Sequence, residues 1–405
     1  MIAPPPVSAP VHVVVSPDKF KGSLTAVEVA ARVAAGLREG FARTLPAQGL
    51  RVSEVPVADG GEGTVDAAVA AGWRPVAAAV TGPTGEPVTA AWARRPGGPE
   101  ALVELAQASG LDRLPGAVRS ALAATSRGTG ELVRAALDDG AREVVLAVGG
   151  SACTDGGSGL LAALGARLLD ARGRDLPDGG GALAHLERVD LSGLDPRVRE
   201  VRWTLAADVD NPLLGPRGAA AVFGPQKGAD PQQVRLLDAA LARLADALVA
   251  AGAPEAREVP GAGAAGGTGL VALGLLGARR RPGVEVVLEL VDWHRRAAGA
   301  HLVVTGEGSL DEQSLGGKTP VGVARAAAAL GAPVVALSGR RTLAEGRWRA
   351  AGFADARALT DVEPDTARCV AQAGPLLQDV ARGLGAELAA AVAAGAPLLP
   401  RAVPG

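Results

Sequence analysis

The sequence has few aromatic residues and few cysteines. Aromatic residues make up 2% of its 405 residues, and Tyr is absent. Proteins that bind single-stranded nucleic acid stack bases on aromatic side chains, so this composition weakens any such role. The two cysteines, Cys153 and Cys369, are too few for a disulfide framework. They predict a reducing, cytoplasmic location.

Long apolar runs and a strong excess of one charge are also missing. No apolar stretch reaches the ~18 residues that a membrane span requires. The formal net charge is −2 and there is no long basic block, so we expect neither nucleic acid nor an anionic membrane as a partner. Residues 1–10 are rich in proline and lack the basic start of a signal peptide. We interpret them as a disordered extension.

What the chain does contain is an alternation of strand and helix patterns. Its length predicts two domains. A capping box formed by Thr25 and Glu28 marks the start of a helix that ends near residue 40, and a second helix is expected over 231–253. A further helix over 318–330 lies between two strands, which indicates a βαβ unit and a largely parallel sheet. The expected strands are 11–15, 51–57, 143–149, 201–207, 301–306 and 333–339.

The first and the last strand–helix stretches of the chain have similar patterns, each an apolar strand followed by a loop and a helix. This similarity predicts a Rossmann-like, doubly wound parallel α/β domain built from both chain ends, residues 11–70 and 285–400. Residues 71–284 would form a large inserted α/β domain. In sheets of this kind, ligands bind at the carboxyl ends of the strands.

Three apolar runs lead into loops of glycines and carboxylates. We call them the first glycine loop (VPVADGGEGT, 55–64), the second glycine loop (VLAVGGSACTDGGSGL, 145–160) and the third glycine loop (LVVTGEGSLDEQS, 302–314). A strand–turn–helix arrangement directs backbone N–H groups at one point, which suits phosphate. Carboxylates in the same loops suit a divalent cation or a hydroxyl proton. The pattern predicts phosphoryl transfer.

Other motifs compete with this interpretation. GAGAAGG at 261–267, with Glu285 downstream, matches a dinucleotide-binding pattern, but no strand precedes it, and close approach to a ligand or another backbone is favoured. LGGKT at 315–319 fails as a P-loop because Glu312 stands where glycine is required. Cys153 could be a nucleophile, but without a convincing His partner a small loop-filling role is favoured. The four histidines show no zinc-binding spacing.

Charged and polar side chains in or near these loops could bind a ligand or could be ordinary turn and cap residues. Asp18 and Lys21 follow the first strand, where a ligand role is favoured. Asp155 is either an N-cap or a Mg²⁺ ligand through water, and Lys227, between glycines, favours an anion contact. The other candidates are Asp59, Glu62, Ser126, Arg127, Asp208, Asp210, Asn211, Glu307, Asp311 and Lys318.

Taken in order, eight strings resemble the bacterial glycerate kinase family, of the two-domain α/β type I. They are SPDKFKGSLTA, VPVADGGEGT, TSRGTGEL, GGSACTDGGSG, DVDNPLLGPRGAA with FGPQKGAD, VPGAGAAGG, and VVTGEGSLDEQSLGGKTPVGVA. The resemblance implies ATP- and Mg²⁺-dependent phosphorylation of D-glycerate, with 2-phosphoglycerate favoured over 3-phosphoglycerate as the product.

Position by position, the resemblance and the chemistry of phosphoryl transfer give predicted roles. The predicted catalytic residues are Lys21, Asp208 and Asp311, and the predicted metal ligands are Asp208, Glu307 and Asp311. Substrate binding is predicted for Asp18, Asp59, Ser126, Arg127, Asn211 and Lys227, with Arg127 as a clamp for the glycerate carboxylate. Phosphate or ATP binding is predicted for Gly149, Gly150, Ser151, Asp155, Gly156, Gly157 and Lys318.

The chain departs from the family pattern at a few positions. Ser16 stands where Ala is usual, Lys19 where Ser is usual, and Cys153–Thr154 where Thr-Asn is usual. Lys19 adds a positive charge near the expected site, and Thr154 loses an amide donor. A NAD-dependent dehydrogenase of a small hydroxy acid and a non-catalytic sugar-acid sensor remain the alternatives. We expect D-glycerate and ATP as partners, and a monomer or a homodimer.

Overall fold

A computed structural model describes residues 10–46 and 49–399. The expected disordered extension lies outside these residues, except for residue 10. The chain forms two compact units. The first unit consists of three segments: the residues up to Asp59, Asp66–Ala71, and the residues from Val284 onward. The second unit comprises Gly60–Val65 and Gly72–Gly283. Segment 60–65, which the predicted boundaries assign to the first domain, therefore lies in the second unit.

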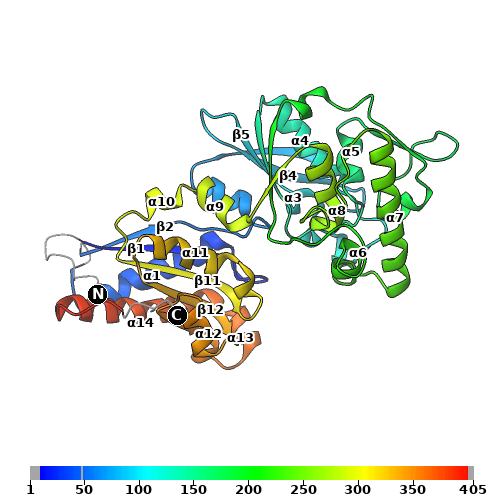
Figure 1. Ribbon diagram of the computed structural model, residues 1–405. Helices are drawn as coiled ribbons and strands as arrows, with labels where there is room; N and C mark the ends of the chain where they lie inside the picture. The colour runs from blue at the N-terminus through cyan, green and yellow to red at the C-terminus, as the bar shows by residue number, and fades with distance from the viewer. Residues whose placement is uncertain (1–9, 47–48, 400–405) are drawn as a thin grey trace. The chain divides into compact units, whose positions relative to one another are not determined.

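The first unit is a parallel sheet with helices on both faces (Figure 1). Its strands are β1 (Val11–Pro17), β2 (Leu50–Glu54), β11 (Leu302–Leu310), β12 (Val334–Arg341) and β13 (Asp355–Ala358). Its helices are α1 (Ala26–Phe41), the end of α2 (Thr64–Ala70), α9 (Gly283–Leu290), α10 (Trp293–Arg296), α11 (Thr319–Ala329), α12 (Glu345–Ala350), α13 (Thr366–Ala371) and α14 (Ala373–Ala393).

The strand order of this sheet is β13-β12-β11-β1-β2, and every pair is parallel. In chain order within the unit this is 2-1-3-4-5, the order of the flavodoxin-like doubly wound fold. The direction of winding reverses between β1 and β11, and the crevice at that point is where such sheets bind ligands. The predicted doubly wound domain built from both chain ends is confirmed.

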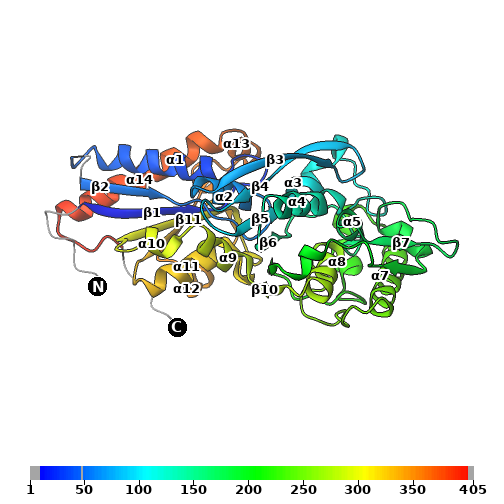
Figure 2. The ribbon, with the colours of Figure 1, turned by 90° about the horizontal axis from the view of Figure 1, so that it is seen from above.

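Side chains of β1 alternate between the two faces of this sheet, as the period of a strand requires. Val13 and Val15 pack with α1 and α14, whereas Val14 packs with α9, α11 and Trp293. Figure 2 shows α1 and α14 on one side of the strands and α10, α11 and α12 on the other. The sheet is thus buried on both faces, which explains the near-continuous apolar run at its first strand.

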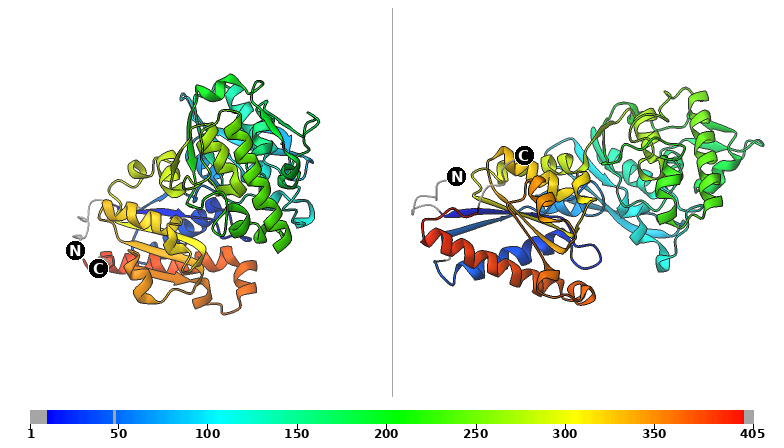
Figure 3. Two further views of the ribbon diagram at one scale, coloured as in Figure 1. Left: turned by 45° about the vertical axis from the view of Figure 1, so that its right-hand side comes forward. Right: turned by 60° about the horizontal axis from the view of Figure 1, so that its bottom comes forward.

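Helices α1 and α14 run side by side (Figure 3) and touch through glycines. A Cβ at Gly40 would lie 2.0 Å from the carbonyl oxygen of Arg382, and one at Gly385 would lie 2.4 Å from that of Leu37. The Thr25–Glu28 capping box predicted for α1 is present. These contacts bring the last long helix of the chain onto the first.

The second unit is built on a mixed sheet with order β10-β9-β6-β5-β4-β3. Strands β5, β6, β9 and β10 run parallel, whereas β4 pairs antiparallel with both β3 and β5. Its strands are β3 (Arg74–Thr81), β4 (Pro87–Arg94), β5 (Glu100–Glu104), β6 (Glu143–Ala147), β9 (Arg202–Ala206), β10 (Arg279–Arg281) and the separate pair β7 (Arg167–Leu169) and β8 (Arg188–Asp190). Its helices are α3 (Ala106–Ser109), α4 (Arg127–Asp138), α5 (Ser158–Ala163), α6 (Ala219–Phe223), α7 (Pro231–Ala250) and α8 (Ala264–Leu270).

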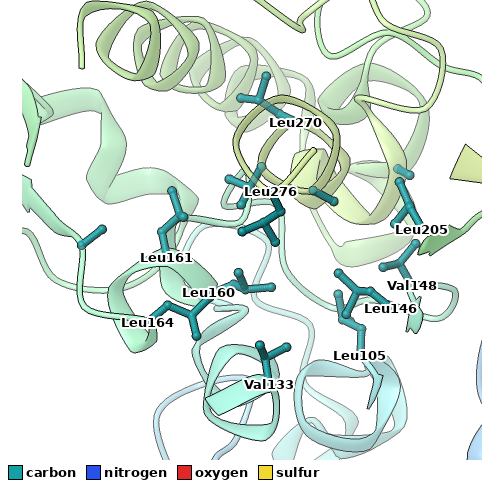
Figure 4. Packing of buried hydrophobic residues seen from close by; sticks show 14 of the residues in the cluster. Leu105, Val133, Leu146, Val148, Leu160, Leu161, Leu164, Leu205, Leu270 and Leu276 are labelled. Atoms are coloured by element: carbon teal, nitrogen blue, oxygen red, sulfur yellow. The ribbon is translucent and has the colours of Figure 1, made fainter. Parts of the chain in front are cut away.

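The core of the second unit lies between this sheet and its helices. Figure 4 shows Leu146 and Leu205 from neighbouring strands facing Leu160 of α5 and Leu270 of α8. All four side chains are buried. The predicted α/β class of the inserted part is confirmed.

The third glycine loop is the main error in the predicted elements. Strand β11 extends to Leu310, beyond its predicted end at residue 306, so Glu307 and Gly308 lie in a strand and not in a loop. The reason is pairing with β12, where Glu307 lies opposite Ser338. A Cβ at Gly306 would lie 1.8 Å from the carbonyl oxygen of Leu337, so glycine serves close strand contact there. Among the described residues, no helix is long and apolar enough to cross a membrane.

Candidate functional site

At the winding reversal of the first unit, one carboxylate directly follows β1 and another lies within the adjacent strand β11. Asp18 follows β1 directly, and its N–H donates to the carbonyl of Gly306 at 2.8 Å. Glu307 is the next residue of β11. This is the crevice where doubly wound sheets bind ligands, so the predicted location of Asp18 and Glu307 agrees with the topology.

The carboxylate of Asp18 is held in place by two donors. Thr319, at the start of α11, donates its hydroxyl to Oδ2 at 2.6 Å, and the N–H of Lys19 donates to Oδ1 at 2.7 Å. Burial raises the pKa of Asp18 to about 6, with the charge of Asp59 adding to the shift and that of Lys19 opposing it. Lys19, where the family usually has Ser, therefore offsets the concentration of negative charge at this edge.

Glu307 differs from Asp18 because one of its oxygens is not satisfied. The side chain is 9% exposed, and Oε1 is buried without a hydrogen-bond partner among the described residues. Burial raises the pKa of Glu307 to about 7. A buried carboxylate oxygen without a donor is costly, so this atom is suited to a cation or a ligand hydroxyl.

Asp311, by contrast, is engaged in a turn. Its oxygens accept from the hydroxyl of Ser309 at 3.0 Å and from the N–H of Gln313 at 2.9 Å. Burial opposes these bonds, but together with Lys318 they keep the pKa of Asp311 below its usual value. Lys318 is half-buried and its Nζ donates to Gln313 at 3.4 Å. Lys21 is exposed.

In the second unit, the first and second glycine loops meet. The N–H of Gly149 donates to the carbonyl of Gly60 at 3.2 Å, and a Cβ at Gly149 would lie 2.6 Å from Cα of Gly61. Glu104, fully buried at the end of β5, accepts from the N–H of Gly63 at 3.2 Å and from that of Val65 at 2.9 Å. One buried carboxylate thus fixes the first loop at the carboxyl edge of this sheet.

The carboxylate of Asp155 accepts four hydrogen bonds that hold the second glycine loop in place. Its Oδ2 accepts from the N–H and the hydroxyl of Ser126, both at 2.8 Å, and from the N–H of Gly159 at 3.2 Å. Its Oδ1 accepts from the N–H of Gly157 at 3.1 Å. The N–H of Gly156 donates to Gly266 at 3.0 Å. These bonds argue against direct phosphate contacts by Asp155, Gly156 and Gly157, because the groups that would make them already have protein partners.

Lys227 is buried below the same loop at 1% exposure. Its Nζ donates to Oγ of Ser151 at 2.9 Å and to the carbonyl of Cys153 at 2.5 Å. Cys153 is fully buried, and burial raises the pKa of its thiol far above the usual range. The favoured interpretation of Cys153 as a loop-filling residue agrees with this environment, since the thiolate is the reactive form.

Three further predicted residues of the second unit bond to other protein groups; Asp208 is exposed, and Arg127 and Asn211 are half-buried. Arg127, predicted to clamp a carboxylate of the substrate, instead forms a two-pronged ion pair with Asp178, with contacts of 2.6 and 2.8 Å. Asp208 is exposed after β9, and its Oδ1 accepts from the N–H of Gly283 at 2.6 Å. Asn211 donates to the carbonyl of Arg217 at 2.7 Å.

The GAGAAGG segment packs against the second glycine loop. No strand precedes it, and a Cβ at Gly266 would lie 2.1 Å from the carbonyl oxygen of Cys153. Gly266 also has a φ of 65°, which favours glycine. The glycines therefore serve close backbone approach, the interpretation favoured over a dinucleotide fingerprint.

The predicted metal ligands divide between the two units. Asp208 belongs to the second unit, and Glu307 and Asp311 belong to the first. Across residues 10–46 and 49–399, no group of three His, Cys, Asp or Glu side chains could hold a metal ion. Mg²⁺ commonly takes one or two carboxylates, with waters and substrate phosphates completing its shell. The unpaired oxygen of Glu307 fits that requirement better than the engaged oxygens of Asp311.

Some residues that shape the site were not predicted from the sequence. Glu104 fixes the first loop, Thr319 holds Asp18, and Asp178 binds Arg127. A signal for Glu104 was present, because this charged residue interrupts the apolar run ALVEL at 101–105. Thr319 and Asp178 carry no comparable signal, since their partners lie 301 and 51 residues away.

Comparisons with known proteins agree on one family. The family model described as the glycerate kinase family matches residues 13–389. A glycerate kinase of Bacillus subtilis is 46% identical over 328 residues, covering 81% of this chain and 84% of the relative. A glycerate 2-kinase of Escherichia coli is 44% identical, covering 82% and 85%. A crystal structure described as a glycerate kinase 2 of Salmonella typhimurium superimposes with a TM-score of 0.79 at 39% identity, covering 94% of this chain and 99% of that one.

Proposed function

The chain belongs to the glycerate kinase family and is a kinase, and we propose that it transfers the γ-phosphoryl group of ATP to the 2-hydroxyl of D-glycerate in a Mg²⁺-dependent reaction. The product would be 2-phosphoglycerate. The observation that carries the proposal is the family match over residues 13–389, which includes the predicted residues of both units. The 2-position is supported by the name of the Escherichia coli relative, a glycerate 2-kinase.

The chemistry is a direct in-line transfer. The glycerate hydroxyl oxygen forms a bond to the γ-phosphorus, the bond from that phosphorus to the β–γ bridging oxygen breaks, and ADP leaves. The hydroxyl proton passes to a carboxylate of the protein. Positioning and positive charge supply most of the acceleration in such a reaction, because charge is spread over the phosphoryl oxygens.

We assign proton acceptance to Asp208 in preference to Asp311. Asp208 is exposed at the end of β9, whereas both oxygens of Asp311 are engaged in its turn. Lys21 and Lys318 are the cations that would offset the developing charge. Asp18 and Asp59, at the carboxyl edge of the first sheet, would accept hydrogen bonds from glycerate hydroxyls.

Glu307 is the residue that fits a magnesium ion. Its buried Oε1 has no partner among the described residues, and Mg²⁺ prefers hard oxygen donors. When bound with ATP, the ion neutralises charge on the phosphate oxygens. A cytoplasmic location is likewise a proposal, supported by the presence of both cysteines as free thiols.

The decisive experiment is ³¹P NMR of the product that the full chain forms from D-glycerate, ATP and MgCl₂. We expect the resonance of 2-phosphoglycerate and its loss when EDTA removes the metal. Formation of 3-phosphoglycerate would refute the assigned hydroxyl. Glycerate-dependent absorbance at the nicotinamide band without phosphorylated product would instead support the dehydrogenase, and unchanged ATP hydrolysis on adding glycerate would support the sensor.

Variants then test the assigned groups. Asp208→Asn and Lys21→Ala should each lower kcat by at least roughly 100-fold, the scale of one general-base or charge-stabilising group. Asp112→Asn is the matched control, because Asp112 is exposed in the second unit and makes no side-chain hydrogen bond with another described residue. Near-wild-type kcat in Asp208→Asn would reassign the proton acceptor.

A further inference from the structure

Lys227 is a buried cation whose partners are both neutral. It is one of the largest fully buried side chains of the described chain. Its ammonium group donates to a hydroxyl, that of Ser151, and to a backbone carbonyl, that of Cys153. No ion pair to Lys227 occurs among the described residues. A buried ammonium without an ion-pair partner is costly, so its retention needs a reason beyond packing.

The hydrogen bond to Ser151 fixes which atom donates. An ammonium group has three donors and no acceptor, so Oγ of Ser151 must accept from Lys227. A serine hydroxyl has one hydrogen of its own, and that hydrogen cannot point at Lys227. Ser151 is 6% exposed and Lys227 only 1%. The hydroxyl of Ser151 is therefore the part of the pair that can reach a ligand, and it does so as a donor.

The neighbouring backbone provides further donors at this end of the second glycine loop. The N–H groups at 156, 157 and 159 are engaged by Gly266 and Asp155. The N–H groups of Gly150 and Ser151 have no hydrogen-bond partner within the described residues. Gly150 is exposed and has a φ of 77°, a conformation in which successive N–H groups form anion-binding concavities.

The electrostatics of Lys227 agree with this geometry. Burial lowers the pKa of Lys227, and the negative charge of Asp155 acts against that shift. Asp155 cannot supply a direct partner, because its oxygens accept from Ser126, Gly157 and Gly159. An oxyanion that accepts from Ser151 would bring a negative charge to the far side of that hydroxyl, two hydrogen bonds away from the ammonium group.

We propose that Lys227 is a positioning residue that fixes the hydroxyl of Ser151 as a donor to an oxyanion bound at Gly150 and Ser151. The oxyanion is a phosphate of ATP or the carboxylate of glycerate, an identification that rests on the proposed function. Lys227 thus acts through Ser151 and does not contact the ligand. This differs from the substrate-binding role that the sequence predicts for it.

Three variants and a matched control test the proposal. Ser151→Ala removes the hydroxyl, Lys227→Met removes the ammonium group at similar volume, and the double variant removes both. Ser158→Ala, at the first residue of α5 and directly after Gly157, is the control. It also removes a buried serine hydroxyl, but one without a side-chain hydrogen bond among the described residues. Binding is measured by calorimetry with a non-hydrolysable ATP analogue and, separately, with D-glycerate, alongside KM, kcat and the thermal unfolding temperature.

We expect Ser151→Ala to weaken binding of one of the two ligands by about 10- to 100-fold, the effect of one hydrogen bond to a charged group. Its unfolding temperature should match that of Ser158→Ala. Lys227→Met should weaken binding of the same ligand. The double variant should bind that ligand no less tightly than the single variant with the lower affinity, because both residues act through one donor. The ligand affected identifies the oxyanion.

Several outcomes would overturn the proposal. If Ser151→Ala binds both ligands as tightly as wild type, the hydroxyl of Ser151 is not the donor. If the losses of affinity of the two single variants multiply in the double variant, Lys227 acts independently of Ser151. If Lys227→Met does not fold, Ser151→Thr decides, because it keeps a hydroxyl and should restore the affinity that Ser151→Ala loses. A wild-type chain that forms no phosphoglycerate, yet binds one ligand through Ser151, would refute the proposed function and leave this inference standing.

Discussion

Asp155 offers the sharpest test of how the second glycine loop is built. We predict that Asp155→Asn destabilises the second unit, because the carboxylate accepts four hydrogen bonds in a fully buried position. An amide has only one acceptor oxygen. If that oxygen replaces Oδ2, it keeps the two donors of Ser126 and that of Gly159, and the N–H of Gly157 then faces an NH₂ group.

The expected loss follows from these bonds. One buried donor left without an acceptor costs about 1–3 kcal/mol, and three bonds that change from charged to neutral lose roughly 1 kcal/mol each. Allowing for non-additivity among bonds that share one group, the free energy of unfolding should fall by about 3–5 kcal/mol. For a unit of this size, that lowers the unfolding temperature by roughly 10 °C.

The assay is thermal and urea unfolding of Asp155→Asn beside wild type and Asp112→Asn. The exposed control should stay within about 0.5 kcal/mol of wild type. A similarly small change in Asp155→Asn would refute the view that this carboxylate holds the loop. If stability is unchanged and affinity for the ATP analogue falls, Asp155 is instead the ligand-binding residue that the sequence predicts.

Three other perturbations test the remaining contacts. Glu104→Gln should speed hydrogen exchange of the amides of the first glycine loop by about 10-fold, since one of its oxygens becomes a donor; unchanged exchange would contradict its role. Gly149→Ala should cost about 1–3 kcal/mol because its Cβ would meet Gly61, whereas Gly346→Ala, in open space within α12, should be neutral or slightly stabilising. Glu307, whose pKa is raised from 4.5 to about 7, stabilises the fold fully below about pH 4.5 and loses that contribution as pH rises through 7. Wild type should therefore lose unfolding free energy relative to Glu307→Gln between pH 5 and pH 8, and parallel urea-unfolding profiles would refute this.

The first helix shows what local sequence can predict. Its start is encoded within four residues, because the hydroxyl of Thr25 accepts from the N–H of Glu28 while the Glu28 side chain accepts from the N–H of Thr25. Both partners lie in the same turn, so the pattern alone suffices. Strand β1 is similar, since a run of buried valines needs no knowledge of its neighbours to be identified as a central strand.

The third glycine loop shows where local information ends. Its glycines and carboxylates are typical of a turn, yet β11 continues to Leu310. Pairing with β12 decides the outcome, and β12 lies about 30 residues further along the chain. Gly306 is needed because a Cβ there would clash with the carbonyl oxygen of Leu337 in β12, and not because its own segment turns. Such a non-local contact leaves no mark in the local pattern.

The candidate site was predictable in position but not in the direction that its side chains face. The carboxyl ends of parallel strands collect polar residues, and this rule favoured a ligand role for Asp18, which directly follows β1. The same rule could not show that Lys227 bonds to Ser151, 76 residues away, or that Asp155 bonds to Ser126, 29 residues away. Composition marks both as charged loop residues, and only the folded chain distinguishes a ligand contact from a loop support.

Satisfaction of buried oxygens provides that distinction for the carboxylates. Glu104 and Asp155 are fully buried and accept hydrogen bonds at both oxygens, so their charge is stabilised by the protein itself and they hold loops. Glu307 is buried with one oxygen that no described group satisfies, and burial outweighs the stabilisation of its charge by Ser314 and Lys318, so its charge is better stabilised when something else binds. Removing the charge should therefore have opposite effects at pH 8. Glu307→Gln should raise unfolding free energy and impair Mg²⁺–ATP binding, whereas Asp155→Asn should lower unfolding free energy whether or not a ligand is present.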